Sequence, residues 1–275
     1  MINILLSTYN GEKYLKEQLE SIIKQSHSDW TLYIRDDGST DNTISIIDEY
    51  CSRYPNKIVK YEDCLGNIGS LHSFEELLKQ AKSDYFMFCD QDDVWLPQKI
   101  EKAMSEMVIC ENANPATPVI VCSDLIVVDE HLNKLSGSFW SYSKIAPQYL
   151  QKTNQLAVNN YVTGCTMLFN KKAKDVSLPL GKNAIMHDSW IALKIKASNG
   201  IISVLKEPYI LYRQHGLNQI GAISINHNIK YFLGKIMAVK KVIRNNYIIF
   251  KQSNEILGIS LLCFFYNRII YLIKR

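Results

Sequence analysis

The chain has 275 residues, of which 47% are hydrophobic and 21% charged, and it carries a formal net charge of +4. These values are ordinary for a globular protein and suit one large domain, or one domain with an appendage. The seven cysteines are odd in number, scattered, and include no C-x-x-C pair, which excludes a disulfide framework and a zinc site and indicates reduced thiols in a cytosolic setting.

The amino-terminal part of the chain alternates between short apolar strands and amphipathic helices. Residues 2–6 predict a strand rather than a signal peptide, because no basic segment precedes their short apolar run. Further strands are predicted at 30–34, 58–61 and 85–88. Helical spacing predicts the intervening helices, whose inward faces contain Leu15, Leu19, Ile22 and Ile23, then Ile44, Ile47 and Cys51, then Leu71, Phe74, Leu77, Leu78 and Ala81.

This alternation predicts a mostly parallel sheet with helices on both faces. In sheets of this kind, ligands bind at the carboxyl ends of the strands, where the loops converge. The stretches that follow the first, second and fourth strands are polar, at residues 7–9, 36–37 and 90–93. We therefore expect these strand-end loops to share one crevice.

The most acidic of these loops contains Asp90, Asp92 and Asp93 directly after an apolar strand. Carboxylates held this close repel one another unless a cation lies between them, and Mg²⁺ or Mn²⁺ prefers carboxylate and water oxygens. Because Asp90 and Asp92 can converge only where the strand has broken into a turn, we expect a loop with Asp92 as the direct ligand. An EF-hand is excluded, since Val94 and Trp95 follow in place of a third ligand and a glycine. The alternative is a solvated acidic turn before a helix.

The second polar loop, Asp36-Asp37-Gly38-Ser39, has two interpretations. A carboxylate such as Asp37 can accept a hydrogen bond from the imide N–H of uracil or thymine, while a cation at Asp92 offsets a diphosphate charge. The same stretch also makes a good turn followed by a helix cap.

The second half of the chain is less regular. Its elements are expected in this order: a strand at 119–128 that carries Asp124 near its middle, a strand at 164–169, a helix from His187 to about residue 197, and short strands at 201–205 and 209–212. A polar loop at 213–216 follows them.

Motifs occur in register along the chain, namely Ser7-Thr8-Tyr9-Asn10-Gly11, Arg35-Asp36-Asp37-Gly38-Ser39-Thr40-Asp41, Asp90-Gln91-Asp92-Asp93-Val94-Trp95-Leu96-Pro97 and His187-Asp188. Together they resemble the family 2 glycosyltransferases of the GT-A fold over about residues 1–220. The resemblance implies an α/β, Rossmann-like, mostly parallel sheet with flanking helices. It also implies one domain with a nucleotide-sugar-binding half at 1–97 and an acceptor-binding half at 98–225.

A narrower likeness lies in the form Gln91-Asp92-Asp93-x-Trp95, combined with Tyr212-Arg213-Gln214-His215-Gly216 and a following Gly221-Ala222. It is similar to a bacterial branch of the family that includes rhamnosyltransferases of surface polysaccharide assembly.

Carried over by position, the resemblance implies roles for the residues of the strand-end loops. Thr8, Tyr9 and Asp37 would hold the base and ribose of the nucleotide. Asp90 would contact ribose or a metal-bound water. Asp92 would bind the Mg²⁺ or Mn²⁺ that bridges the diphosphate.

Asp188 would be the general base that takes the acceptor's proton, with inversion at the anomeric carbon; alternatively it is an acid favoured at a helix amino terminus. The family's usual Glu-Asp pair appears here as His187-Asp188. His215 would complete the metal or diphosphate site, or would be a loop histidine bonded to backbone. Arg213 would contact the diphosphate or form a structural salt bridge. Asn67 would approach the nucleotide or only make its turn.

Residues 226–275 differ from the rest in charge. Their nine Lys and Arg and one acid give +8, which leaves 22 basic and 26 acidic residues, or −4, for residues 1–225. We expect an amphipathic, helical, basic and aromatic tail. Its charge-free stretch 256–267 is too short to span a bilayer, which needs about 20 apolar residues. It suits peripheral attachment to the inner face of the cytoplasmic membrane, with a helical cap on the core or a dimer contact as alternatives. Nucleic acid is disfavoured because the crevice is acidic.

The sequence thus predicts an inverting, metal-dependent glycosyltransferase of bacterial cell-surface polysaccharide synthesis, such as capsule or O-antigen. The expected donor is dTDP-L-rhamnose, with UDP-hexoses as the alternative, and the expected acceptor is a saccharide or a lipid-linked saccharide. A sugar-phosphate nucleotidyltransferase would need a glycine-rich, basic loop after the first strand, which Tyr9-Asn10-Gly11-Glu12 does not supply. A nucleotide-binding scaffold without turnover is disfavoured by the intact Asp92 and Asp188.

Overall fold

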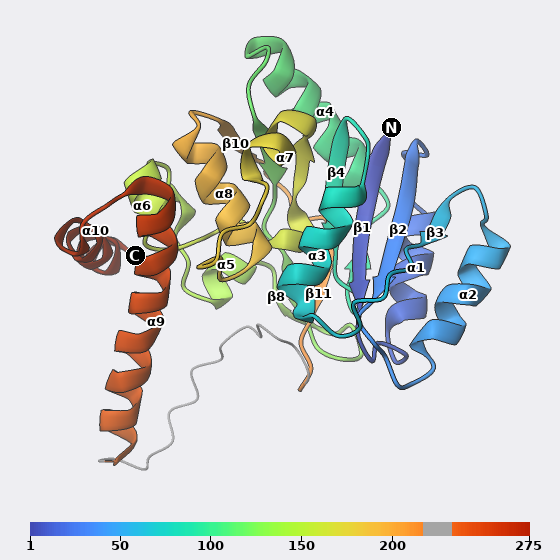
Figure 1. Cartoon of the computed structure of the whole chain (residues 1–275), viewed down its shortest axis with the longest axis horizontal. Coiled ribbons are helices and arrows are strands. Elements are labelled where there is room, and N and C mark those ends of the chain that lie inside the picture. The colour runs from blue at the N-terminus through green and yellow to red at the C-terminus, as the bar shows by residue number, and fades with distance from the viewer. Residues whose placement is uncertain (217–232) are drawn as a thin grey trace.

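The computed structural model describes residues 1–216 and 233–275, with side chains up to residue 216 and from residue 242 onward (Figure 1). The domain boundary expected at residues 225 and 226 lies outside the described residues. The division expected at residues 97 and 98 falls between strand β5 (Val94–Trp95) and helix α4 (Lys99–Ala113).

The main sheet has seven strands in the order β10-β6-β9-β4-β1-β2-β3. In chain order these are β1 (Ile2–Thr8), β2 (Trp30–Asp36), β3 (Ile58–Lys60), β4 (Tyr85–Cys89), β6 (Val119–Cys122), β9 (Leu168–Asn170) and β10 (Ile201–Val204). Neighbouring strands run parallel except at β9, which is antiparallel to both β4 and β6. The mostly parallel sheet predicted from the sequence is confirmed.

Both faces of this sheet are packed, as the central strand β1 illustrates. Ile4 and Leu6 belong to one apolar core, and Leu5 between them belongs to the other. The first core is covered by α1 (Leu15–Ile23), α2 (Thr43–Arg53) and α4, and the second by α3 (Gly69–Gln80), α7 (Lys171–Ser177) and α8 (His187–Ala197). Strands that are buried on both faces must be apolar almost throughout, which explains their continuous apolar sequences.

A smaller sheet of four strands has the order β5-β11-β7-β8, where β11 is Ile210–Arg213, β7 is Ile126–Val128 and β8 is Lys134–Ser136. The single strand expected at 119–128 is wrong, because the chain leaves the main sheet after Cys122 and enters the smaller sheet at Ile126. Asp124 holds this break: its carboxylate accepts hydrogen bonds from the backbone N–H of Leu125 and Trp140. Local bonds of this kind compete with a continuous strand ladder.

The strand expected at 164–169 is also shorter than predicted. Gly164–Thr166 forms a single 3-10 turn, and β9 begins only at Leu168. The Thr166 hydroxyl donates to the carbonyl of Thr163 at 2.7 Å, which favours the turn over an extended chain. The short helices α5 (Phe139–Tyr142) and α6 (Thr153–Leu156) precede it.

The predicted helical tail is present as α9 (Leu233–Leu257) and α10 (Leu261–Lys274), which extend from one side of the sheet domain (Figure 1). Within the described residues, no single helix has both the length and the hydropathy to cross a membrane. Among the described helices, the pair Val242–Leu257 and Leu261–Lys274 together has sufficient length and hydropathy, but the two helices are bent by 119° relative to each other.

Candidate active site

A cavity of about 640 Å³ lies at the carboxyl ends of β1, β2 and β4. Each of the strand-end loops contributes to its lining, among them Thr8, Asp37 and Asp92. The rest of the lining includes residues of the segment 156–164, of the beginning of α8 and of α9. The loops that were expected to share a crevice therefore do so, and the cavity also receives residues from the tail.

The loop after β2 uses its two aspartates differently. The carboxylate of Asp36 accepts hydrogen bonds from the N–H groups of Gly38 and Ser39 and from the hydroxyl of Thr8. Asp36 therefore makes the turn, as one interpretation of this stretch proposed. Asp37 instead lines the cavity, which is the position that the other interpretation requires.

Asp37 also organises the wall around it. Its Oδ1 accepts a hydrogen bond from Nη1 of Arg35 at 2.6 Å, and both groups are almost fully buried. Its two oxygens also accept from the N–H groups of Ile68 and Gly69, at 2.9 and 2.8 Å. The exposed Asn67 lies in the loop held this way and lines the cavity as well. Asp37 and Asn67 are thus brought together at one side of the cavity.

Tyr9 stands at the cavity rim with 47% of its surface exposed. Its backbone N–H donates to Oε1 of Gln91 at 2.9 Å, and its carbonyl accepts from Nε2 of Gln91 at 3.0 Å. This paired contact joins the loop after β1 to the acidic loop after β4. The Tyr9 ring remains available to a flat ligand such as a nucleotide base.

Asp92 and His215 were both expected at the metal site, and the structure brings them together. Oδ2 of Asp92 lies 2.8 Å from Nε2 of His215. The His215 ring packs on Tyr14, with ring centroids 4.8 Å apart. Asp92 lines the cavity, so that a cation bound to this pair would face a ligand inside it.

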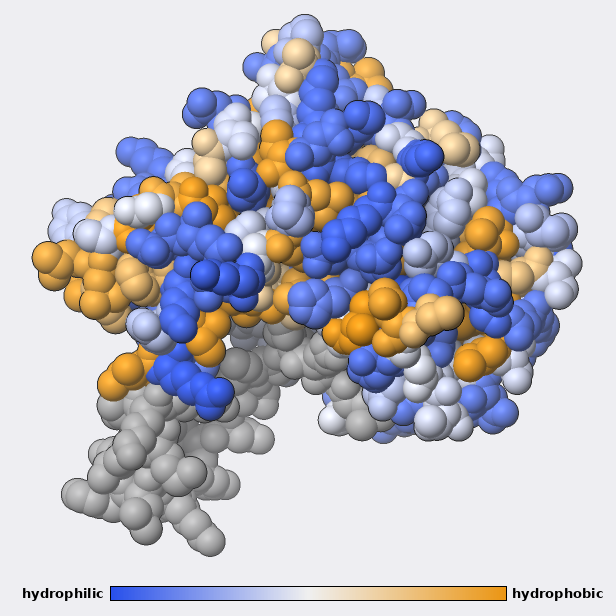
Figure 2. Space-filling model, viewed as in Figure 1, coloured by the Kyte–Doolittle hydropathy of each residue, from blue (hydrophilic) through white to orange (hydrophobic). Residues whose placement is uncertain are grey.

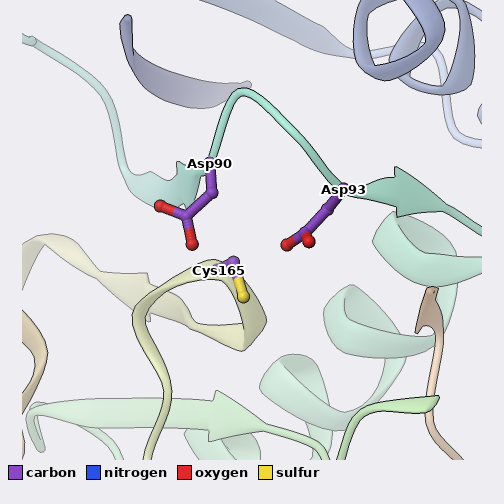
Figure 3. A group of neighbouring side chains, drawn as sticks. All are labelled: Asp90, Asp93 and Cys165. Atoms are coloured by element: carbon purple, nitrogen blue, oxygen red, sulfur yellow. The ribbon is translucent and has the colours of Figure 1, made fainter. Parts of the chain in front are cut away.

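Asp90 also lines the cavity, and its side chain lies close to Asp93 and Cys165 (Figure 3). One ligand atom from each of these side chains lies within 4.8 Å of the others. Asp93 is fully buried; its Oδ1 accepts the N–H of Arg213, whereas its Oδ2 has no hydrogen-bond partner among the described residues.

The crowded carboxylates hold protons more tightly than usual. Burial raises the pKa of Asp90 to about 7, and the charges of Asp92 and Asp188 act in the same direction. Burial, followed by repulsion from Asp92, raises the pKa of Asp93 well above its usual range. An orphaned buried carboxylate oxygen beside further acids fits a divalent cation, whose charge would offset the repulsion. The carboxylate donors suit Mg²⁺ or Mn²⁺.

Arg213 lies beneath the acidic loop and does not line the cavity. Its Nε donates to the carbonyl of Asp92 at 2.8 Å, and its Nη1 donates to the carbonyl of Glu130 at 2.6 Å. Its Nη2 donates to the carboxylate of Glu17. The predicted contact with a diphosphate remains untested, while these bonds correspond to the structural alternative.

His187 and Asp188 begin α8, and both line the cavity. Oδ1 of Asp188 accepts the N–H of Ser189, and Oδ2 accepts the N–H of Gly164 at 3.1 Å. Burial raises the pKa of Asp188 to about 6. The backbone donors fix the direction of the carboxylate, and the raised pKa makes it a stronger base than an ordinary aspartate.

The His187 ring is buried between aromatic neighbours, with centroids 4.3 Å from Phe74 and 4.5 Å from Phe88. Neither ring nitrogen has a hydrogen-bond partner among the described residues, and burial lowers the pKa of His187 to about 3. His187 is therefore neutral. A Cβ on Gly164 would lie 2.5 Å from His187 Nε2, so the close packing of this ring requires glycine there.

Sequence reasoning assigned no role to two residues that shape the site. Gln91 belongs to a quoted motif, but nothing in the motif indicates that it binds the backbone of Tyr9. Gln252 belongs to α9, lines the cavity, and accepts hydrogen bonds from the N–H of Ile185 and the hydroxyl of Ser189. Because Gln252 lies far from every motif along the chain, the sequence gave no indication of this contact.

The mostly parallel sheet with a cavity and an acidic loop at its strand ends defines an α/β fold of the GT-A type, and comparisons with known proteins specify the family. A sequence profile of glycosyl transferase family 2 matches residues 3–177. The chain therefore belongs to glycosyl transferase family 2, and it is a glycosyltransferase.

The chain is 28% identical to the dTDP-rhamnosyl transferase RfbG of Shigella flexneri over 237 residues, which are 82% of this chain and 76% of that protein. Among solved structures, residues 1–349 of S. aureus TarS in complex with UDP-GlcNAc give a TM-score of 0.57 at 19% identity, over 93% of this chain and 70% of the other. The mannosyltransferase PcManGT of Pyrobaculum calidifontis, in complex with GDP-Man and Mn²⁺, gives a TM-score of 0.58 at 15% identity, over 99% and 74%.

Other matches cover less of the similar protein. The chain spans 66% of one uncharacterised Nostoc glycosyltransferase and 60% of TarS residues 1–349 in the complex with UDP. The solved structures support the GT-A-like fold, and the family profile and curated relatives support the enzyme class.

Proposed function

We propose that this glycosyltransferase moves a sugar from a nucleotide donor to a saccharide acceptor with inversion at the anomeric carbon. The observation that carries the proposal is one cavity lined by both Asp92 and Asp188. A cation site and a base that face one cavity match the needs of this reaction, in which a diphosphate leaves while a hydroxyl attacks from the opposite face.

On the donor side, Thr8, Tyr9, Asp37 and Asn67 would hold the nucleoside. Asp92 and His215 would hold Mg²⁺ or Mn²⁺, with Asp90 close by. The bound cation would supply stabilisation of the negative charge that develops on the leaving diphosphate. The complex of PcManGT with GDP-Man and Mn²⁺ supports this assignment by analogy of fold.

On the acceptor side, Asp188 would take the proton of the attacking hydroxyl. Its orientation by the N–H groups of Gly164 and Ser189 directs the carboxylate, and its pKa of about 6 leaves it ionised at neutral pH. The neutral His187 beside it adds no charge that would compete for this proton.

The proposed donor is dTDP-L-rhamnose, supported by the similarity to a dTDP-rhamnosyl transferase. UDP-hexoses are the alternative, because TarS residues 1–349 have been crystallised with UDP-GlcNAc. The proposed setting is cell-surface polysaccharide synthesis on the cytoplasmic side of the membrane. The acceptor would be a saccharide, free or lipid-linked.

The test is calorimetric titration of the protein with dTDP and with UDP, each with and without Mn²⁺. We expect dTDP to bind more tightly than UDP and to require the metal. Asp92→Ala should abolish the metal-dependent part, whereas the control Asp175→Ala, on the exposed face of α7, should not. Failure of both nucleotides to bind under every condition would refute the donor class, and tighter binding of UDP would replace the proposed nucleotide.

A further inference from the structure

Helix α10 carries a row of exposed apolar side chains at helical spacing. It contains Leu262, Phe265, Tyr266, Ile269, Leu272 and Ile273, which we call the α10 stripe. Leu262 is 85% exposed and Ile273 77%. In Figure 2 this part of the surface forms an orange area at the left edge, over α10. Apolar side chains gathered in this way on a surface indicate a binding partner.

The opposite side of α10 is fastened to the domain, which fixes the stripe outward. Phe264 and Tyr271 are buried there. The Tyr271 hydroxyl accepts hydrogen bonds from the N–H of Ala146 at 3.2 Å and from Nδ2 of Asn159 at 2.9 Å. Arg268 Nη1 donates to the carbonyl of Val158 at 2.6 Å. The exposed stripe is thus the remaining face of a helix that is already docked.

Basic residues accompany the stripe. Lys274 and Arg275 follow it directly, and Arg244 and Lys251 are exposed on α9. The one acid of residues 226–275 is Glu255, and it accepts hydrogen bonds from the N–H and the Nδ2 of Asn183. Apolar side chains flanked by positive charge match the acyl and headgroup layers of an anionic bilayer.

We propose that the α10 stripe docks in the surface of an anionic lipid bilayer, with α10 lying in the interface. A spanning role is disfavoured because α10 has 14 residues, and about 20 are needed. A second copy of the chain is a poorer occupant, because a two-fold contact through this face would bring its basic groups together. Anionic headgroups would instead neutralise them.

This docking would place the acceptor side of the cavity at the lipid surface. The segment 146–159, which binds Tyr271, continues into cavity-lining residues, and α9 adds Ile249 and Gln252. A lipid-linked saccharide held in the bilayer could therefore reach the cavity without leaving the membrane. This consequence rests on the proposed function, whereas the docking surface itself does not.

The test is co-sedimentation of the full chain with vesicles of phosphatidylcholine, with and without phosphatidylglycerol. We expect binding that needs the anionic lipid and weakens at high salt. Leu262→Glu/Ile273→Glu should lower the partition coefficient by about tenfold or more, because it places charges in the apolar layer. Val108→Glu/Ile109→Glu, on the exposed side of α4, is the matched control and should bind like the original chain.

Several results would overturn the proposal. These are no vesicle binding by the original chain, equal binding by the α10 variant, or light scattering that shows a lipid-free dimer dissociated by the α10 variant. Nucleotide titration of the same preparations separates the outcomes. Normal dTDP or UDP binding without vesicle binding refutes only the docking surface, and vesicle binding without nucleotide binding refutes only the proposed donor.

Discussion

His187 and Asp188 are neighbours in the sequence, and burial favours the uncharged form of both, but only the carboxylate has hydrogen-bond donors. The imidazole is enclosed by aromatic rings, and burial lowers its pKa to about 3. The carboxylate receives two backbone N–H groups, and burial raises its pKa to about 6. Around neutral pH, therefore, the histidine is uncharged and the aspartate ionised. His187 stands where the resemblance implies a glutamate, and its side chain packs against aromatic rings instead of supplying a carboxylate.

The raised pKa of Asp188 predicts how activity depends on pH. A general base works only when it has lost its proton. The value of kcat/KM should therefore fall as the pH is lowered through about 6. Asp188→Asn should lower kcat by about 100-fold or more and remove this acid limb. Sugar release from the donor, followed over a pH series, measures both effects. Asp175→Asn is the control, and an unchanged rate for Asp188→Asn would contradict the assignment.

At the level of single residues, strand-end position was an effective guide. Asp37 and Asp92 line one cavity, as expected for polar residues at the ends of parallel strands, and Asp188, which was assigned by the family resemblance, lines it too. The group of Asp90, Asp93 and Cys165 could not be predicted. It depends on the 3-10 turn that directs Cys165 toward the acidic loop, and that turn interrupts a stretch whose sequence favours a strand.

Among the elements, helix α9 of the tail is bonded directly to the segment around Asp188. Gln252 Oε1 accepts the N–H of Ile185 at 2.9 Å and the hydroxyl of Ser189 at 3.3 Å, and these donors lie on either side of Asp188 in the sequence. Ser253 of the same helix donates to the carbonyl of Ala157. Helix α9 therefore holds the segment that presents Asp188, the proposed base.

Gln252→Ala should lower kcat while leaving nucleotide affinity unchanged. The variant removes the acceptor for Ile185 and Ser189, so the beginning of α8 loosens and Asp188 is held less accurately; a loss of about tenfold is expected. Among the described residues, Gln252 makes its hydrogen bonds to Ile185 and Ser189, outside the loops that we propose for the nucleotide, so dTDP or UDP should bind as before. Steady-state rates and calorimetry measure the two quantities.

Lys251→Ala, on the exposed side of the same helix, is the control for Gln252→Ala. A parallel loss of nucleotide affinity in the Gln252 variant would indicate a general structural role for this residue. An unchanged kcat would show that α9 does not position the base.

The elements of the first part of the chain were predictable because each strand and helix keeps one period. The error at 119–128 arose because an apolar run does not reveal that a strand has changed sheets. Asp124, an acid within that run, was the available signal: buried ladders tolerate such a side chain poorly, and here it bonds the backbone at the break.

At the scale of the whole molecule, Arg213 joins distant parts. It lies on β11 of the smaller sheet and bonds the acidic loop after β4, Glu130 beyond β7, and Glu17 of α1. Only 2% of its surface is exposed. Because its partners lie so far apart in the sequence, this buried cation stabilises the arrangement of the two sheets relative to each other. It contributes less to the stability of any single strand or helix.

Arg213→Met should therefore destabilise the fold. It leaves the carbonyls of Asp92 and Glu130 without their charged donor, so we expect the free energy of unfolding to fall by about 2 kcal/mol or more. Urea denaturation measures the change. Arg53→Met, which removes an exposed ion pair with Glu20, should change it by less than about 0.5 kcal/mol. Unchanged stability with lost nucleotide affinity would instead support the predicted diphosphate contact.

The packing of the tail was the least predictable feature of the molecule. Composition indicated basic, aromatic helices, but it left a membrane surface, a cap on the core and a dimer contact open. The structure shows that α10 caps the domain through Phe264 and Tyr271 and keeps an apolar stripe outward. A helix with apolar residues on several sides can have two partners, and sequence periodicity alone does not separate them.

The contribution of α9 to the cavity also determines the point during synthesis at which the cavity can be completed. The strand-end loops are synthesised before Ile249 and Gln252, which line the same cavity. A nascent chain that has not yet reached Ile249 can present its acidic loop, but one wall is still missing. The cavity thus acquires its final shape only after Gln252 has been synthesised.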